Sequence, residues 1–262
     1  MSFTDVPWTL STDDYRSERV LAAKGDNTIS VVVSAQNESL TIGSVLDAVR
    51  SFRPEGVSFV DELIVVNDHS SDDTATVAER HGARVVELSG PSGKGEAMAC
   101  GLSASRGSLV VFLDADVTNT TVEFVPRLVQ PLLENPEVQL VKAYYERPLL
   151  NMPSGGGRVT ELAARPILAL LFPGLGEIRQ PLAGESAGRR ELFEKVGLES
   201  AYGVEIALLI DVARTYGVHT IAQVDLGVRR HRNRPIEELR PMSVEVLRAA
   251  LERYGVSFPR TD

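Results

Sequence analysis

The stretch Ser108-Leu109-Val110-Val111-Phe112-Leu113-Asp114-Ala115-Asp116 decides the fold class of this chain. Its apolar part is short and rich in branched residues, which is typical of a parallel strand covered on both faces. Asp114 and Asp116 follow where such a strand ends, and ligands of open α/β sheets bind at that edge. Carboxylates there can hold Mg²⁺ or Mn²⁺ together with phosphate oxygens. The stretch therefore predicts a site for a divalent cation and a diphosphate, although such aspartates also form turns and cap helices.

Strands and helices alternate on both sides of this stretch. Periodicity, caps and turn residues predict strands at 29–34, 62–66, 84–88, 108–113, 139–145 and 221–226. They predict helices from 39 or 41 to 50, and at 72–81, 94–106, 122–133, 159–171, 190–196, 203–216 and 236–254, the last with a possible break at Pro241. Residues 148–157 and 173–188 are expected to be loops, and residues 1–27 an arm or a short helix. The alternation indicates an α/β protein with a mostly parallel sheet.

Composition limits the kinds of partner. The chain has 262 residues, 43% of them hydrophobic, and a formal net charge of −9. This charge argues against nucleic acid or an anionic membrane as the main partner. No apolar run approaches the roughly 20 residues of a membrane span, and no signal-peptide pattern is present. The single cysteine, Cys100, fits a reducing compartment and is expected to be a small core residue. We therefore expect a cytoplasmic protein that binds neither nucleic acid nor membrane.

Polar clusters follow the first two predicted strands. They are Ser34-Ala35-Gln36-Asn37-Glu38 and Asn67-Asp68-His69-Ser70-Ser71-Asp72-Asp73. Because parallel strands end at one edge of a sheet, these clusters and Asp114 should form a crevice suited to a nucleotide. Asn37, Glu38 and Asp68 are predicted ligand contacts, whereas Asp72 and Asp73 are predicted helix caps.

Two glycine-rich loops precede predicted helices. In Gly90-Pro91-Ser92-Gly93-Lys94-Gly95, the helix amino terminus and Lys94 suit a phosphate, but Gly95 stands where a Walker loop needs Ser or Thr. In Gly155-Gly156-Gly157-Arg158-Val159-Thr160, Arg158 and Thr160 can hold the carboxylate or phosphate of an acceptor. The alternative for each loop is a flexible turn without a ligand.

A basic run, Arg229-Arg230-His231-Arg232-Asn233-Arg234, follows the last predicted strand. Such a run is usually a solvated surface. Its histidine could instead act as a neutral metal ligand and complete the site of Asp116.

Seven motifs occur in the order found in the glucosyl-3-phosphoglycerate synthase family, which the chain resembles from about residue 20 to 250. They begin at Ser34, Gly93, Asp114, Gly156, Pro181, Tyr202 and Gly227. The resemblance implies a single GT-A-like domain over residues 1–262. Within it, residues 28–145 would form a Rossmann-like nucleotide-sugar half, 146–235 an acceptor half and 236–262 a C-terminal helix. The implied reaction is a retaining transfer of glucose from a nucleoside diphosphate sugar, expected to be UDP-glucose, to the 2-hydroxyl of 3-phosphoglycerate.

The resemblance also implies roles for individual residues. Asp116 and His231 match the ligands of a divalent metal, Mg²⁺ or Mn²⁺. The implied donor contacts are Ala35, Gln36, Asn37, Glu38, Asp68, Ser70, Lys94, Asp114, Ala115 and Arg229, and the implied acceptor contacts are Gly157, Arg158, Thr160 and Asn233. The candidate catalytic residues are Asp116, Lys94 and Glu205. A carboxylate such as Glu205 can serve as a nucleophile, but we prefer a same-face route, in which the departing phosphate oxygen takes the acceptor proton.

Gln36 and His69 depart from the family pattern where the base and ribose should bind. A related glycosyltransferase with another donor, or with another phosphorylated or carboxylated acceptor, is therefore an alternative. A sugar-phosphate nucleotidyltransferase is a second alternative, although its glycine-rich signature is missing after the first strand. A non-catalytic nucleotide-sensing module is a third. We also expect a homodimer.

Overall fold

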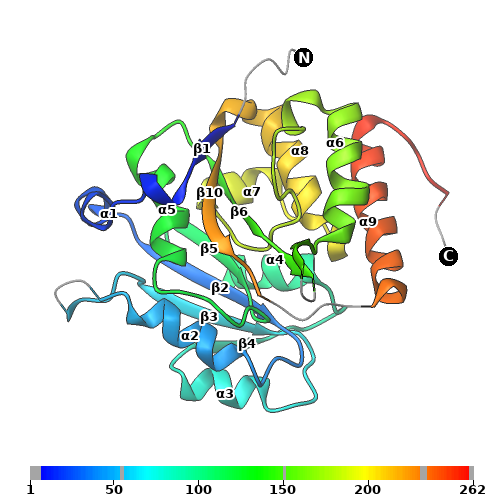
Figure 1. Ribbon diagram of the computed structural model, residues 1–262. Coiled ribbons are helices and arrows are strands. Elements are labelled where there is room, and N and C mark those ends of the chain that lie inside the picture. The colour runs from blue at the N-terminus through cyan, green and yellow to red at the C-terminus, as the bar shows by residue number, and fades with distance from the viewer. Residues whose placement is uncertain (1–6, 54–55, 150–151, 231–234, 260–262) are drawn as a thin grey trace.

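The apolar run before Asp114 forms β5 (Leu109–Asp114), an inner strand of an eight-stranded sheet (Figure 1). The computed structural model describes residues 7–53, 56–149, 152–230 and 235–259. The strand order is β1-β10-β6-β9-β5-β2-β3-β4. Only β9 runs antiparallel to its neighbours, β5 and β6, among these strands. The predicted α/β class with a mostly parallel sheet is confirmed.

The parallel register brings the strand ends to one edge. Ser34 lies beside Asp114, and Ala35 beside Asn67. The loops after β2, β3 and β5 therefore begin side by side, as the sequence predicted. The remaining strands of the sheet are β1 (Trp8–Leu10), β2 (Ile29–Ala35), β3 (Glu62–Asn67), β4 (Arg84–Glu87), β6 (Leu140–Glu146), β9 (Ser186–Arg189) and β10 (Ile221–Val228).

Helices cover both faces of the sheet and create two buried apolar clusters (Figure 1). One cluster joins the sheet to α1 (Ser17–Lys24), α2 (Ile42–Ser51), α3 (Thr74–Arg80) and α5 (Phe124–Glu134). The other joins it to α4 (Lys94–Ala104), α6 (Arg165–Leu171), α7 (Arg190–Val196), α8 (Val204–Tyr216) and α9 (Ile236–Tyr254). Burial on both faces explains why the inner strands read as continuous apolar runs.

The structure corrects three expectations about elements. The predicted loop 173–188 contains the start of β9, whose residues Ser-Ala-Gly-Arg lack a strand pattern but pair with β5 on one side and with β6 on the other. The predicted loop 148–157 contains a short hairpin, β7 (Pro148–Leu149) and β8 (Met152–Gly155). The helix α9 continues through Pro241 without a break. In the N-terminal part, the short helix is confirmed, and β1 adds an unpredicted edge strand.

A π-helical turn, Thr160–Ala164, precedes α6. Pro166 has no N–H to donate to the fourth residue before it, which explains a local departure from α-helical bonding. Such turns often occur at functional sites.

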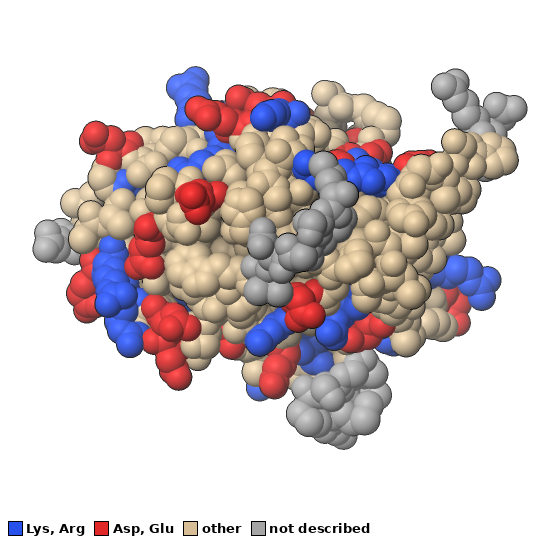
Figure 2. All heavy atoms as spheres, turned by 90° about the horizontal axis from the view of Figure 1, so that it is seen from above, with Lys and Arg blue, Asp and Glu red and all other residues tan. Residues whose placement is uncertain are grey.

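Charges of both signs are interspersed on the face seen from above (Figure 2). No helix in the described part of the chain is long and apolar enough to cross a membrane. The densest group of buried charges lies inside a cavity at the carboxyl edge of the sheet.

Candidate active site

The cavity at this edge has a volume of about 500 Å³. The loops after β2, β3 and β5 line one side, with the start of α4. The other side is formed by the turn before α6, by α8 and by the first half of α9. Its lining includes the predicted residues Ala35, Gln36, Asn37, Glu38, Asp68, Lys94, Asp114, Ala115, Asp116, Gly157, Arg158, Thr160, Glu205 and Arg229. Residues predicted from separate motifs are thus brought into one site.

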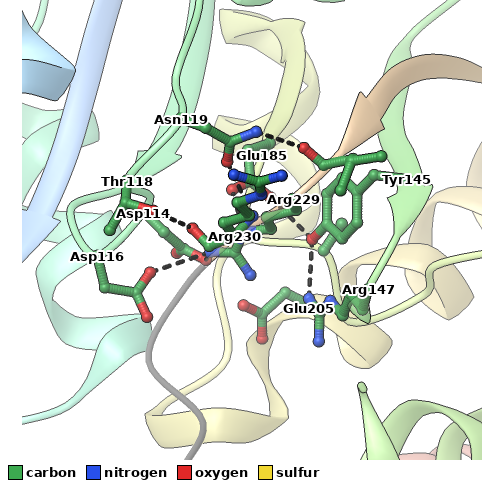
Figure 3. Close-up of polar contacts among 12 residues, drawn as sticks. Asp114, Asp116, Thr118, Asn119, Tyr145, Arg147, Glu185, Glu205, Arg229 and Arg230 are labelled. Atoms are coloured by element: carbon green, nitrogen blue, oxygen red, sulfur yellow. Dashed lines mark hydrogen bonds and ion pairs between the residues drawn. The ribbon is translucent and has the colours of Figure 1, made fainter. Parts of the chain in front are cut away.

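A chain of alternating charges crosses the cavity floor (Figure 3). Lys94 Nζ lies 2.5 Å from Glu205 Oε1 and 2.9 Å from Asp114 Oδ1. Arg229 Nη2 lies 2.6 Å from Asp114 Oδ2 and 3.1 Å from Asp116 Oδ1. Asp114 therefore shares its two oxygens between two cations, and both aspartates of the motif face Arg229.

These pairings set the protonation of the site. Burial would raise the pKa of Asp114, but Lys94 and Arg229 hold it well below its ordinary value. Burial would lower the pKa of Lys94, but Asp114 and Glu205 raise it well above the usual range. Asp114 is therefore an anion and Lys94 a cation at neutral pH, which suits a site for a diphosphate and its counter-ion.

A buried carboxylate supports Arg229 from behind. Glu185 is 1% exposed, and its Oε1 lies 2.9 Å from Arg229 Nε. Tyr145 donates to Glu185 Oε2 at 2.9 Å, and Arg147 Nη2 donates to the Tyr145 hydroxyl at 2.8 Å (Figure 3). Burial raises the pKa of Tyr145 to about 12, so its hydroxyl keeps the proton that it donates. These contacts fix the direction in which Arg229 points.

The backbone beside Arg229 is held by the turn that follows β5. Asn119 Nδ2 donates to the Val228 carbonyl at 2.6 Å and its Oδ1 accepts from Arg230 N at 2.8 Å, while Thr118 N donates to the Arg230 carbonyl (Figure 3). The end of β10 is thereby attached to the turn after Asp116. This contact could not be predicted from local sequence, because the two segments are more than 100 residues apart.

The donor-side loops are cross-linked by their own polar groups. Gln36 Nε2 donates to the Asp68 carbonyl at 2.9 Å, and Asp68 Oδ2 accepts from Gly93 N at 3.1 Å. Ser70 Oγ accepts from Asn37 N at 3.0 Å. Ser70 is not among the residues that line the cavity. It supports the loop of Asn37, and a direct donor contact from it stays a prediction.

Gly95 explains how Lys94 and Glu205 meet. A Cβ at this position would overlap the carbonyl oxygen of Glu199, so only glycine lets the segment before α8 approach the start of α4. Glu96 Oε2 also accepts from Ala201 N at 3.0 Å. This close packing brings Glu205, in the first turn of α8, to Lys94.

The predicted acceptor loop lines the same cavity as Asp116. Gly156 N donates to the Arg147 carbonyl at 3.0 Å, and Glu161 N to the Gly157 carbonyl at 3.0 Å. Thr160 is buried and Arg158 half-buried, and both line the cavity. Arg147, which the sequence did not single out, also lines it and adds another cation on this side.

Two predicted residues, His231 and Asn233, lie outside the described residues. In the described part of the chain, no three His, Cys, Asp or Glu residues are grouped so that they could hold a metal. The chemistry of Asp114 and Asp116 nevertheless fits a hard divalent cation, because two carboxylates at one strand end offer the oxygen donors that it prefers. The pairing of Asp116 with His231 stays a prediction.

Several cavity residues were missed. Leu182, Leu239, Met242 and Val246 give the cavity an apolar wall, and Glu238 lies at its edge. Their sequence pattern, in α9 especially, is the ordinary one of a helix that packs on a core, so nothing distinguished them. Glu185 belongs to the motif that begins at Pro181, but its burial is visible only in the structure.

The fold and site define the class of the protein as a nucleotide-sugar-dependent glycosyltransferase. Residues 30–197 match the family model described as Glycosyl transferase family 2. This match confirms the enzyme class expected from the sequence, a glycosyltransferase.

Individual relatives narrow the class further. Glucosyl-3-phosphoglycerate synthase of Mycolicibacterium paratuberculosis is 50% identical over 250 residues, which cover 90% of this chain and 75% of the relative. A crystal structure of the Mycobacterium tuberculosis synthase with Mn²⁺, UDP-glucose and phosphoglyceric acid matches with a TM-score of 0.88 and 45% identity, over 97% of this chain and 89% of that one. Another crystal structure of the M. tuberculosis synthase, with Mg²⁺ and UDP, matches with a TM-score of 0.87 and 46% identity, over 96% of this chain and 88% of that one. The chain belongs to the glucosyl-3-phosphoglycerate synthase family, and the predicted family and fold class are confirmed.

Proposed function

We propose that this chain transfers glucose from UDP-glucose to the 2-hydroxyl of 3-phosphoglycerate, with retention of the anomeric configuration. The observation that carries the proposal is a single cavity lined both by the Asp114–Asp116 cluster and by Arg147, Arg158 and Thr160. The first suits a metal-bound diphosphate, and the second suits a small anionic acceptor. The M. tuberculosis synthase binds UDP-glucose and phosphoglyceric acid together, which supports the same pair of ligands here.

The proposed assignments follow the geometry. Asp116 and His231 would hold Mg²⁺ or Mn²⁺, with Asp114 beside the donor ribose or sugar. When bound, that ion neutralises charge on the leaving diphosphate. Lys94 and Arg229 already point at the aspartates and would share that stabilisation. The loops at 35–38 and 68–70 would hold the base and ribose.

Glu205 is the candidate for contact with the transferred sugar. It lines the cavity, is 4% exposed and is paired with Lys94. This pairing favours a positioning role over nucleophilic attack, because the ammonium group stabilises the carboxylate and reduces its nucleophilicity. The acceptor proton would then pass to the departing phosphate oxygen on the same face.

A matrix of nucleotide sugars against small phosphorylated acids tests the function, with release of nucleoside diphosphate as the readout. We expect UDP-glucose with 3-phosphoglycerate to be the most active pair, activity to vanish with a chelator, and Mg²⁺ or Mn²⁺ to restore it. Full activity without metal would contradict the metal assignment. A preference for GDP over UDP of more than tenfold, about 1.4 kcal/mol, would overturn the donor.

The same assay separates the alternatives. Release of pyrophosphate from a nucleoside triphosphate and a sugar phosphate would indicate a nucleotidyltransferase. Nucleotide binding without turnover of any pair would indicate a sensing module.

We further propose that the protein is a cytoplasmic homodimer. Leu162 and Leu170 are 78% and 79% exposed, and Pro166, Ala169 and Pro173 are exposed beside them. This apolar stripe on the turn before α6 and on α6 itself offers a surface that a second copy can cover. The single thiol of Cys100 fits a reducing compartment.

A further inference from the structure

Lys142 is a buried cation that the reaction assignments above do not use. It lies in β6, is 1% exposed, and its Nζ donates to the carbonyl of Ala183. Its Cα is paired with Ser186 of β9 on one side and Gln223 of β10 on the other. Burying an ammonium group costs folding free energy, so a buried lysine bound to a backbone carbonyl is expected to have a structural or functional role.

The segment that Lys142 binds, residues 181–185, packs against two residues of the donor site, Asp114 and Arg229. A Cβ added at Gly184 would overlap the carboxylate of Asp114, so the backbone of this segment lies directly against that side chain. The next residue, Glu185, binds Arg229 Nε at 2.9 Å. Leu182 lines the cavity itself. A shift of this segment would therefore move both Asp114 and Arg229.

Several charged groups of the site lie close enough to act on Lys142. Glu205 of α8, Lys94 of α4, Glu185 and Asp114 act on it. Burial lowers the pKa of Lys142 to about 8, against the opposing effect of the carboxylates. The side chain is thus part of the electrostatic balance of the site, as well as a hydrogen-bond donor.

We propose that Lys142 is a positioning residue for the donor nucleotide. By binding the Ala183 carbonyl, it fixes segment 181–185, and through Gly184 and Glu185 that segment orients Asp114 and Arg229 toward a diphosphate. The inference rests on the proposed function for the identity of this ligand.

The test is Lys142→Met, which keeps the length of the side chain and removes its donor and charge. Calorimetry with UDP and Mn²⁺ should show a Kd raised about tenfold or more, with a stoichiometry near that of the wild type. The KM for 3-phosphoglycerate should stay within about twofold, because segment 181–185 packs against Asp114 and binds Arg229, which are assigned to the donor. A change only in stoichiometry or kcat, with Kd and both KM values unchanged, would reduce Lys142 to a structural residue and overturn the proposal.

Gln223→Met is the matched control. Gln223 lies opposite Lys142, is 2% exposed, and its Nε2 donates to the Glu177 carbonyl at 3.2 Å. It is also a buried polar side chain bound to backbone before β9, but its backbone partners are Glu177 and Arg179, outside segment 181–185. We expect this variant to lose thermal stability while keeping the UDP affinity of the wild type.

If Lys142→Met does not fold, Gly184→Ala displaces the same segment from its other side and should weaken UDP binding in the same way. Unchanged UDP affinity in a folded Gly184→Ala protein would overturn the proposal. Failure of the proposed function would look different, since wild-type protein would then bind UDP with Mn²⁺ but transfer no glucose to 3-phosphoglycerate.

Discussion

At the scale of single residues, Asp114 connects the parts of the site. One oxygen binds Lys94 from α4, the other binds Arg229 from the end of β10, and the backbone of Gly184 packs against the carboxylate. Each cation has a second acidic partner, Glu205 or Glu185. A change in any one of these charges therefore leaves a buried neighbour uncompensated, and such losses are not expected to be additive.

Arg158 tests the acceptor assignment. Arg158→Lys keeps the charge but loses the planar fork that binds a carboxylate or phosphate with two hydrogen bonds. The loss of a charge-assisted contact is worth about 1.5–3 kcal/mol, so kcat/KM for 3-phosphoglycerate should fall roughly ten- to a hundredfold, mainly through KM. UDP binding, measured by calorimetry, should barely change.

Arg165→Lys provides the matched control, because Arg165 is an exposed residue about two turns further along that pairs with Glu161 and does not line the cavity. Its kinetics should match those of the wild type. If Arg158→Lys impairs nucleotide-sugar binding and leaves acceptor kinetics unchanged, the two sides of the cavity have been assigned the wrong ligands.

At the scale of elements, the loops at the sheet edge hold one another in place. Asp72 accepts from Thr74 N at 3.0 Å at the start of α3 and from Ser39 N at 3.1 Å before α2. It thus binds the first residue of α3 from the position before the N-cap, Asp73, and ties the loop before α2 to it. Glu38 N, which donates to Thr74 Oγ1 at 2.8 Å, adds a parallel link. The cavity edge is therefore ordered by contacts that need no ligand.

The stabilising effect of Asp72 should depend on pH. Slight burial would raise its pKa, but hydrogen bonds from Thr74 and Ser39 lower it to about 2, from an unfolded value of 3.8. A carboxylate whose pKa is lower in the folded state contributes stability above the unfolded pKa and loses it as pH falls through the folded pKa. Asp72→Ala should cost about 1 kcal/mol at pH 7, and this difference from the wild type should shrink between pH 4 and 2.

Denaturant unfolding at several pH values measures this difference. Asp73→Ala is the control, because Asp73 makes no side-chain capping hydrogen bond. A cost for Asp72→Ala that stays constant down to pH 2 would show that the ionised carboxylate is not the source of the stability.

At the scale of the whole molecule, the antiparallel strand β9 joins the two parts of the sheet. It lies between β5, which contains Asp114, and β6, which contains Lys142 and Tyr145 and is followed directly by Arg147. The division of the chain into a donor half (28–145) and an acceptor half (146–235) stays a prediction. In the structure, β6, β9 and β10 belong to the same sheet as β2, β3 and β5.

The apolar stripe provides a test of the oligomeric state. Leu170→Glu places a charge in the middle of the stripe, so a dimer that buries it should dissociate. Light scattering after gel filtration should give twice the mass of the chain for the wild type and the mass of a single chain for the variant. Leu40→Glu, at an exposed leucine before α2, should remain dimeric. A monomeric wild type would contradict the proposal, and a dimeric Leu170→Glu would place the interface elsewhere.

The residues of the site that could be predicted are those that lie next to a strand end or in a glycine-rich loop. Asp114, Asp116, Asn37, Asp68 and Lys94 were found because parallel strands end at one edge, a rule that needs only the order of the elements. Glu205 and Arg229 came from the resemblance. Arg147, Glu185 and Lys142 could not be found, because nothing local in the sequence separates a buried charge from a surface charge.

The sequence by itself determined the family, the α/β class and the edge at which the ligands should bind, since local periodicity and strand-end chemistry depend on neighbours along the chain. Only the tertiary structure decided that β9 enters the sheet in the opposite direction, that Asp114 is shared by Lys94 and Arg229, and that Lys142 supports the segment behind it. These contacts join residues that are 20 to more than 100 positions apart. Their energies depend on burial and on the spatial arrangement of charges, and neither is encoded in any single stretch of sequence.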